Sequence, residues 1–358
     1  LFLLRLMYLQ CERVMLYSAP TPAPLVGAQV VQGDYMLLAS VAILVGLPLL
    51  LWSADKFVGG AAVVAKHFGL SPILIGMLII GFGTSAPEII VSIIAAMEQS
   101  SGIALGNAYG SNIANIALIL GITALISPIA VRSEIIRKEL PIMLGLTFFA
   151  AWQVLDLQVS KDDAFSLLGL FILLISWSIW TGMRGDKDAL AAEYDEELNL
   201  ADTNLKKETL WLIVGLLILV ASSRLLVWGG VEVATYFGVS DVVIGLTILA
   251  IGTSLPELAS SLVAVKKGEH DLALGNVIGS NMFNTLAVVG IAGVIHPMEV
   301  SSDFLYRDVL FMLVASVALF IFCIGLKGPG RLNRLEGGVF VAAYAGYTWY
   351  LINSSFIG

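Results

Sequence analysis

A short polar motif occurs twice in this chain, each time within a long apolar stretch. Residues 83–88 read GTSAPE, and residues 252–257, which lie 169 positions further along, read GTSLPE. A second motif repeats at the same offset, as GNAYGSNIAN at 106–115 and GNVIGSNMFN at 275–284. Two motifs in the same order, aligned without a gap, indicate an internal duplication. The chain is therefore expected to fold as two similar halves.

The apolar stretches around these motifs exclude an ordinary soluble fold. Apolar residues make up 58% of the 358 residues, charged residues make up 13%, and the mean hydropathy is +0.92. A typical soluble domain has about 25% charged residues. We therefore predict an all-α polytopic membrane protein embedded in the lipid bilayer. The net charge of −8 argues against a nucleic-acid partner, and Cys11 and Cys323 are too few and too far apart for a disulfide framework or a thiolate metal site.

Ten apolar segments are long enough to span a membrane, for which about 20 residues are needed. The predicted spans are 36–53, 70–97, 103–126, 139–156 and 164–182 in the first half, and 209–228, 239–265, 271–294, 308–326 and 336–353 in the second. The resulting organisation is a leader at 1–35, a first repeat at 36–182, a polar linker at 183–208 and a second repeat at 209–355.

The leader at 1–35 begins with Leu and contains a Pro-rich stretch that cannot continue a helix. We interpret it as a non-native or misassigned segment with Met36 as the start, and a cleaved signal peptide is the alternative.

Five spans per repeat place the two halves in opposite orientations, because an odd number of crossings inverts the topology. The positive-inside rule supports this count. Fourteen Lys and Arg residues fall on the side of the central linker and five on the other side. The linker is therefore predicted to be cytoplasmic and both termini to lie across the membrane, which for a bacterial protein is the inner membrane.

Glu88 and Glu257 lie well inside apolar spans, where an ionised carboxylate costs at least about 2.5 kcal/mol. The nearest basic residues in the sequence, Lys66, Arg224 and Lys266, fall near the ends of spans, where long side chains extend to the interface. Each glutamate is therefore expected to be either protonated or neutralised by a bound cation.

The residues around each glutamate supply further oxygen atoms. The hydroxyl residues precede each glutamate by four and three positions, which would place them on the same helix face as the carboxylate. The next span repeats a Ser and an Asn four residues apart. The hydroxyl and amide residues are Thr84, Ser85, Ser111 and Asn115 in the first half and Thr253, Ser254, Ser280 and Asn284 in the second. Pro87 and Pro256 each disrupt the helix and free the carbonyl four residues earlier, at Gly83 and Gly252.

A site built from oxygen atoms suits a hard cation such as Ca²⁺, which takes 6–8 oxygen ligands, or Na⁺. It does not suit zinc or copper, because neither motif contains Cys or His. Mg²⁺ fits less well because it dehydrates reluctantly and requires near-octahedral geometry. Two glutamates carry a formal charge of −2, which balances one Ca²⁺.

Other features of the repeats have structural explanations. Small residues on membrane helices usually serve packing, and we interpret Gly76, Gly121, Gly245 and Gly290 in this way. Two further asparagines allow two interpretations: Asn107 and Asn276 either line an ion path or cap the starts of the third and eighth spans.

These duplicated motifs resemble those of the cation/Ca²⁺ exchanger superfamily, specifically the bacterial sodium/calcium exchangers, over about residues 36–355. The resemblance implies ten helices in two inverted repeats, with the second, third, seventh and eighth spans holding the ions and the first and sixth sliding past them. It assigns the family's ligands to the hydroxyl and amide residues above, to both glutamates, and to the backbone carbonyls of Gly81 and Ala250. It implies an antiporter that exports Ca²⁺ in exchange for Na⁺, without a cofactor.

One position departs from some members of this family. Asn284 stands where they have Asp, a position that the family links to protonation or to K⁺ dependence. This difference leaves a Ca²⁺/H⁺ exchanger, K⁺ co-transport and a passive cation channel as alternatives. An intramembrane enzyme is disfavoured, because no His or Lys accompanies the Ser and Glu residues of the motifs. No obligate protein partner is evident from the sequence.

Overall fold

The computed structural model describes residues 28–67, 72–133, 135–184, 205–237, 250–324 and 330–357. The first half contains α2 (Ala28–His67), α3 (Pro72–Ile75), η1 (Gly76–Ile80), α4 (Gly81–Thr84), α5 (Ala86–Met97), α6 (Ser101–Ile113), η2 (Ala114–Leu120), α7 (Gly121–Ile126), η3 (Ile135–Glu139), α8 (Leu140–Gln153), η4 (Val154–Asp156) and α9 (Lys161–Arg184). The second half contains α11 (Leu205–Tyr236), α13 (Ala250–Thr253), α14 (Leu255–Lys266), α15 (His270–Phe283), η7 (Asn284–Val288), α16 (Val289–Ile295), η8 (Phe304–Val309), α17 (Leu310–Cys323) and α18 (Arg334–Ile357).

The prediction of a helical membrane protein is confirmed at this level. Six helices in the described part of the chain are long and apolar enough to cross a membrane, and the number rises to seven if a bent pair counts as one span. Helical segments fall within all ten predicted ranges where these are described. The arrangement as ten spans in two inverted repeats stays a prediction, as does the division into domains. Residues 1–27 of the leader, 185–204 of the linker and Gly245 lie outside the described residues.

Two short antiparallel ribbons join the halves. β1 (Ile129–Ala130) pairs with β4 (Arg331–Leu332), and β2 (Gln158–Val159) pairs with β3 (Met298–Glu299). β1 and β3 are equivalent under the 169-residue offset, yet they lie in different ribbons. Each ribbon therefore contains one strand from each half, so the halves are connected by backbone hydrogen bonds as well as by helix packing.

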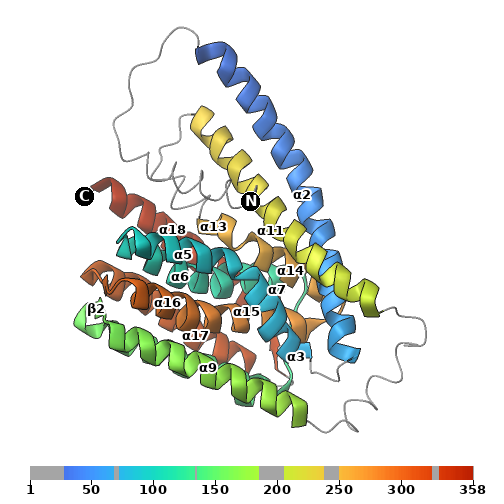
Figure 1. Ribbon diagram of the computed structural model, residues 1–358, viewed down its shortest axis with the longest axis vertical. Helices are drawn as coiled ribbons and strands as arrows, with labels where there is room; N and C mark the ends of the chain where they lie inside the picture. Colours follow the sequence, from blue (N-terminus) through green and yellow to red (C-terminus); the bar gives the residue numbers. More distant parts are fainter. Residues whose placement is uncertain are drawn as a thin grey trace.

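The long helices α2 and α11 pack along each other and cross beside a bundle formed by the remaining helices (Figure 1). Both expose many large apolar side chains, including Leu44 on α2 and Leu217 on α11, as expected of a surface that faces lipid. The helices that carry the second motif are different. Most of their residues are buried, and α15 is buried along nearly its whole length. The repeated motifs therefore lie in the interior of the bundle.

Glycines permit the closest helix contact in this interior. A Cβ atom added at Gly279 of α15 would lie 2.5 Å from the carbonyl oxygen of Met77, and one added at Gly275 would lie 2.9 Å from the Cα of Gly76. Any side chain here would force the two backbones apart. The packing interpretation of Gly76 is therefore confirmed. It is also confirmed for Gly121, which faces α18, and Gly290, which faces α9.

Candidate functional site

Each glutamate motif interrupts its helix. In the first half, Ser85 separates α4 from α5, and the segments on either side of it are bent by 46°. In the second half, Ser254 separates α13 from α14. The proline follows within the first turn of the new helix, where its missing N–H removes no helical bond. Each break therefore places its glutamate, Glu88 or Glu257, in the first turn of a helix, where the helix dipole favours negative charge.

The two carboxylates are buried and largely without hydrogen-bond donors. Glu88 is 0% exposed and Glu257 is 1% exposed. Among the described residues, neither carboxylate oxygen of Glu88 accepts a hydrogen bond of ordinary geometry, although the Thr253 hydroxyl is near enough to interact with it, and Oε2 of Glu257 also accepts none. The two groups are near enough to act on each other electrostatically. Buried charge of one sign without donors is costly, so this arrangement needs a counter-charge.

A basic residue lies closer to this charge than the sequence suggested. Arg224 is on α11, and that helix continues to Tyr236 rather than ending near 228. The Arg224 guanidinium attracts Glu88 electrostatically. The placement of Arg224 at the end of a span was therefore wrong, because apolar length underestimates a helix that continues past its hydrophobic section.

Side chains of one half contact the motif of the other half. The Ser85 hydroxyl donates to Oε1 of Glu257 at 3.4 Å. The sequence placed Ser85 on the face of its own glutamate, Glu88; Ser85 is the N-cap residue of the helix that carries Glu88, and the shared face stays a prediction. The Thr84 hydroxyl donates to Oδ1 of Asn276 at 3.1 Å and lies 3.5 Å from the Ser280 hydroxyl. The motifs therefore meet as one cluster.

Backbone carbonyls contribute to the same region. The Gly81 carbonyl accepts a hydrogen bond from the Ser280 hydroxyl at 3.3 Å. In the second half, the N–H of Ser254 donates to Ile251 rather than to Ala250. The Gly252 carbonyl, which the sequence predicted to be freed by the proline, accepts from the Ser223 hydroxyl of α11 at 3.0 Å. The two halves therefore differ in how their carbonyls are used.

Asn107 and Asn276 brace each motif against the next helix. Asn107 Nδ2 donates to the backbone carbonyl of Glu88 at 2.9 Å, and Asn276 Nδ2 donates to that of Glu257 at 3.1 Å. Each also donates at 2.9 Å to a serine one turn further along the glutamate helix. Both asparagines lie well inside α6 and α15, so the capping interpretation was wrong. The ion-path interpretation stays a prediction.

The remaining predicted residues lie on the same buried elements. Ser111 is 4% exposed near the end of α6, and Asn115 and Asn284 are fully buried in η2 and η7. Thr253 ends α13, and the Ser254 hydroxyl is buried without a hydrogen-bond partner among the described residues. A π-helical turn therefore carries Asn115 and Asn284, the last asparagine of each motif, and such a distortion is frequent at functional sites.

Sequence reasoning missed Asn112 and Asn281. Asn281 Oδ1 accepts a hydrogen bond from Asn115 Nδ2 at 2.9 Å, and Asn112 Nδ2 donates to the Thr285 hydroxyl at 2.8 Å. The signal that could have found them is their presence in both copies of the second motif.

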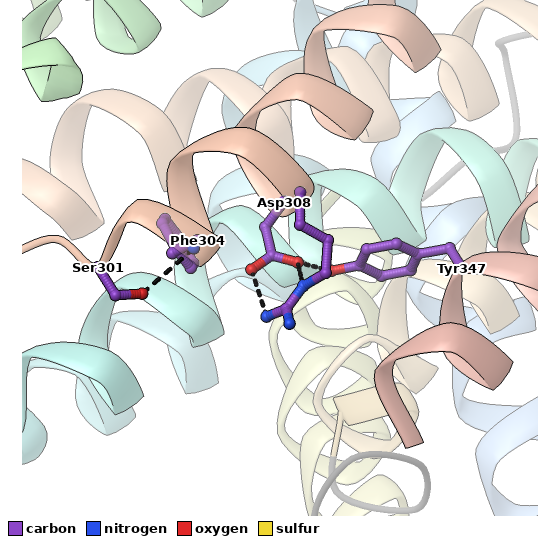
Figure 2. A network of polar contacts seen from close by, with 5 residues as sticks. Ser301, Phe304, Asp308 and Tyr347 are labelled. Carbon is purple, nitrogen blue, oxygen red and sulfur yellow. Dashed lines mark hydrogen bonds and ion pairs between the residues drawn. The ribbon is translucent and has the colours of Figure 1, made fainter. Parts of the chain in front are cut away.

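A third buried carboxylate, that of Asp308, has protein partners for its charge and its hydrogen bonds. Asp308 in η8 is 5% exposed, and Arg307 donates to both of its oxygens at 2.9 Å. The Tyr347 hydroxyl of α18 donates to Oδ1 at 2.6 Å (Figure 2). Asp308 therefore has its charge and hydrogen bonds matched by protein groups, whereas Glu88 and Glu257 retain oxygens without donors.

The cluster can coordinate an ion through oxygen atoms. Within the described ranges, no three or more His, Cys, Asp or Glu side chains gather as a metal-binding group. The candidate ligands are instead two carboxylates supplemented by hydroxyl, amide and carbonyl oxygens. Such a set can hold a hard cation by charge and by ion–dipole contact.

Comparison with known proteins matches both halves to one family. The family model described as "Sodium/calcium exchanger protein" covers residues 38–180 and 207–353. The chain is 45% identical over 320 residues to the putative antiporter CaxA of Alkalimonas amylolytica, covering 89% of this chain and 100% of that protein. It is 40% identical over 319 residues to the inner membrane protein YrbG of Escherichia coli, covering 88% of this chain and 98% of that protein.

Similarity extends to solved structures. Structures of the sodium-calcium exchanger NCX_Mj, one of them soaked with Na⁺ and Sr²⁺, superpose with a TM-score of 0.73 at 32% identity, covering 87% of this chain and 97% of that chain. The sodium/calcium exchanger MaX1 of Methanosarcina acetivorans is 30% identical over 341 residues, covering 85% of this chain and 96% of that protein.

Proposed function

Because this chain belongs to the sodium/calcium exchanger protein family, we propose that it is a secondary antiporter that exports Ca²⁺ in exchange for Na⁺. The observation that carries the proposal is the pair of buried glutamates, Glu88 and Glu257, whose oxygens lack hydrogen-bond donors within the described part of the chain. A transported cation supplies the remaining counter-charge, because the Arg224 guanidinium near Glu88 offsets at most one of the two carboxylate charges. The protein itself catalyses no covalent chemistry and needs no cofactor for this exchange.

The ions bind where the two motifs meet. The proposed ligands are Glu88, Glu257, Thr84, Ser85, Thr253, Ser254, Ser111, Asn115, Ser280 and Asn284, with the backbone carbonyls of Gly81 and Ala250. Contacts between the halves, such as Ser85 with Glu257, support a single shared site. Two glutamates balance one Ca²⁺, so Ca²⁺ and Na⁺ compete for the same oxygens. Either load permits the site to change sides, and this requirement couples the two fluxes.

We propose that the site opens to the two sides of the membrane in turn, by alternating access. In this proposal the ten predicted spans form two inverted repeats, with α2 and α11 as the moving pair and the helices of the motifs as the ion-binding core. The packing of α2 against α11, beside the bundle, supports this division (Figure 1). Among the described residues, the bonds between this pair and the core include the one from Ser223 to the Gly252 carbonyl and the ion pair of Lys267 with Asp55.

We place the protein in the cytoplasmic membrane of a bacterium, with the linker at 183–208 in the cytoplasm and both termini across the membrane. Support comes from the distribution of Lys and Arg in the sequence and from the relative YrbG, which is named an inner membrane protein.

Radiolabelled Ca²⁺ uptake into proteoliposomes tests this function. The wild type is expected to take up Ca²⁺ when the vesicles are loaded with Na⁺ and not when they are loaded with K⁺. Glu257→Gln removes one of the two charges and is expected to reduce this uptake at least about tenfold, the lower end of the losses that follow disruption of a metal site. The matched control Glu98→Gln changes an exposed glutamate at the end of α5 and is expected to transport normally. Uptake without any counter-ion gradient would instead identify a channel.

A Ca²⁺/H⁺ exchanger of the same fold is the second candidate. The donor-free oxygens of Glu88 favour it as well, because protons can neutralise a buried carboxylate as effectively as a cation. In the same vesicles, uptake driven by a pH gradient alone would assign this coupling, and uptake that needs Na⁺ would reject it. Addition of K⁺ to the Na⁺-loaded vesicles tests K⁺ co-transport.

A further inference from the structure

Two of the three asparagines in each copy of the second motif lie three residues apart near its end. Under the 169-residue offset Asn112 corresponds to Asn281, and Asn115 corresponds to Asn284. All four side chains are buried, with exposures between 0% and 4%. A buried amide must place two donors and one acceptor, so the hydrogen bonds of these side chains determine which atoms remain for an ion.

The two halves satisfy these amides differently. Asn115 Nδ2 donates to Asn281 Oδ1 at 2.9 Å, and Asn115 Oδ1 has no donor among the described residues. The equivalent bond between Asn284 and Asn112 is absent from the described residues, where both amide atoms of Asn284 lack a partner. Asn115 therefore has a fixed orientation, and Asn284 has none.

The halves also differ at one residue beside these asparagines. Asn112 Nδ2 donates to the Thr285 hydroxyl at 2.8 Å and to the sulfur of Met312 at 3.6 Å. The position equivalent to Thr285 in the first half is Ile116, which has no hydroxyl. The NH₂ group of Asn281 therefore has no hydroxyl at the equivalent position, and its one described contact is a long one of 4.0 Å to the sulfur of Met143.

We propose that Asn281 is a positioning residue that holds the amide of Asn115 with its carbonyl oxygen presented to the transported cation, an inference that rests on the proposed function. The bond to Asn281 commits the NH₂ group of Asn115, so that Oδ1 is the atom left to meet an ion. Asn284 has no such anchor, and its amide reorients to suit the ion that is bound.

The physical effect is preorganisation. An amide that is free to rotate can turn its NH₂ group toward the ion, which repels a cation and must be reversed before binding. Groups that orient a metal ligand typically contribute 10- to 100-fold to metal affinity. Asn281 therefore strengthens binding through Asn115 without touching the ion.

A double-mutant cycle in Ca²⁺ binding tests this role. Ca²⁺ affinity of the purified full-length protein is measured by equilibrium binding of radiolabelled Ca²⁺ for wild type, Asn281→Ala, Asn115→Ala and the double variant. Asn281→Ala is expected to weaken binding about tenfold in the wild-type background. In the Asn115→Ala background the same change is expected to have less than about a twofold effect, because the ligand it orients is gone. Equal losses in both backgrounds would overturn the proposal.

A second variant distinguishes loss of the hydrogen bond to Asn115 from a general packing defect at position 281. Asn281→Asp keeps an acceptor oxygen in a side chain of the same shape, and any added negative charge favours a cation. It is expected to bind Ca²⁺ at least as tightly as the wild type, and a loss as large as that of Asn281→Ala would overturn the proposal. The matched control is Thr147→Ala, which removes a buried side-chain hydrogen bond within α8 and should change the affinity less than about twofold, since Thr147 contacts no proposed ligand in the described part of the chain. An effect of Thr147→Ala as large as that of Asn281→Ala would contradict a specific role for Asn281.

The same assay separates this inference from the function on which it rests. Failure of the wild type to bind Ca²⁺ would overturn both. Ca²⁺ binding by the wild type that Glu257→Gln abolishes, together with equal losses for Asn281→Ala in both backgrounds, would overturn the role of Asn281 alone.

Discussion

At the scale of single residues, the decisive contrast is between two kinds of buried acid. Asp308 has two bonds from Arg307 and one from Tyr347, so the protein itself satisfies it. Glu88 has no hydrogen bond to either carboxylate oxygen among the described residues. The bonds to Asp308 stabilise the fold only if both partners are present, because a lost partner leaves a buried charge unpaired. The charge of Glu88 must instead be neutralised by a bound cation or by protons.

The satisfied acid leads to a prediction about stability. Tyr347→Phe removes the hydroxyl that donates to Asp308 and is expected to cost about 1.5 kcal/mol, the lower range for a hydrogen bond to a charged group. The melting temperature of the purified protein should fall, and Ca²⁺ affinity should stay unchanged because Asp308 lies outside the proposed site. Tyr350→Phe is the matched control on the same helix, where the side chain is 56% exposed. A loss of Ca²⁺ affinity with no change in melting temperature would contradict this assignment.

Residue types and their partners differ in how well the sequence predicts them. The importance of Glu88 and Glu257 could be predicted, because a carboxylate in an apolar segment is costly wherever it points. The bond from Ser85 to Glu257 could not be predicted, since it joins residues of different halves and depends on how the broken helices face each other. The same holds for Asn281, whose bond to Asn115 also joins residues of different halves.

At the scale of elements, breaks and close approaches position the site. The breaks at Ser85 and Ser254 follow from the prolines and were predictable in place. The π-helical turns η2 and η7 hold Asn115 and Asn284. These turns were not predictable, because no residue type marks them. Helix ends also differed from the apolar ranges: α11 spans Leu205–Tyr236, longer than its predicted 209–228, because helices continue past the hydrophobic section.

The approach of α15 to η1 gives a prediction for this scale. Gly279→Ala places a Cβ 2.5 Å from the Met77 carbonyl oxygen, closer than real Cβ atoms come. The helices must separate, and overpacking of this kind typically costs about 1–3 kcal/mol. A lower melting temperature is expected, together with weaker Ca²⁺ binding because Ser280 is displaced from Gly81. Gly145→Ala, at an exposed glycine of α8 with no described neighbour within 4 Å, is the control and should be neutral. Equal behaviour of the two variants would contradict this account of the packing.

At the scale of the whole molecule, duplication explains why the site is central. Each half supplies one broken helix and one asparagine helix, and the cluster is complete only where the halves meet. The two β-ribbons are likewise each formed by one strand from each half. The duplication and the helical membrane class were visible in the sequence because they depend on periodicity and composition alone. How the halves face each other was not visible, because it depends on packing over the entire chain.

The most direct test of the shared site is competition between the two ions at equilibrium. Binding of radiolabelled Ca²⁺ to the purified protein is measured over a range of Ca²⁺ concentrations at several fixed Na⁺ concentrations, with K⁺ or choline maintaining the ionic strength. The account predicts that Na⁺ raises the Ca²⁺ concentration needed for half-saturation while maximal binding stays the same, since both ions use the oxygens of Glu88 and Glu257. Half-saturation that does not change when Na⁺ is raised about tenfold would contradict it.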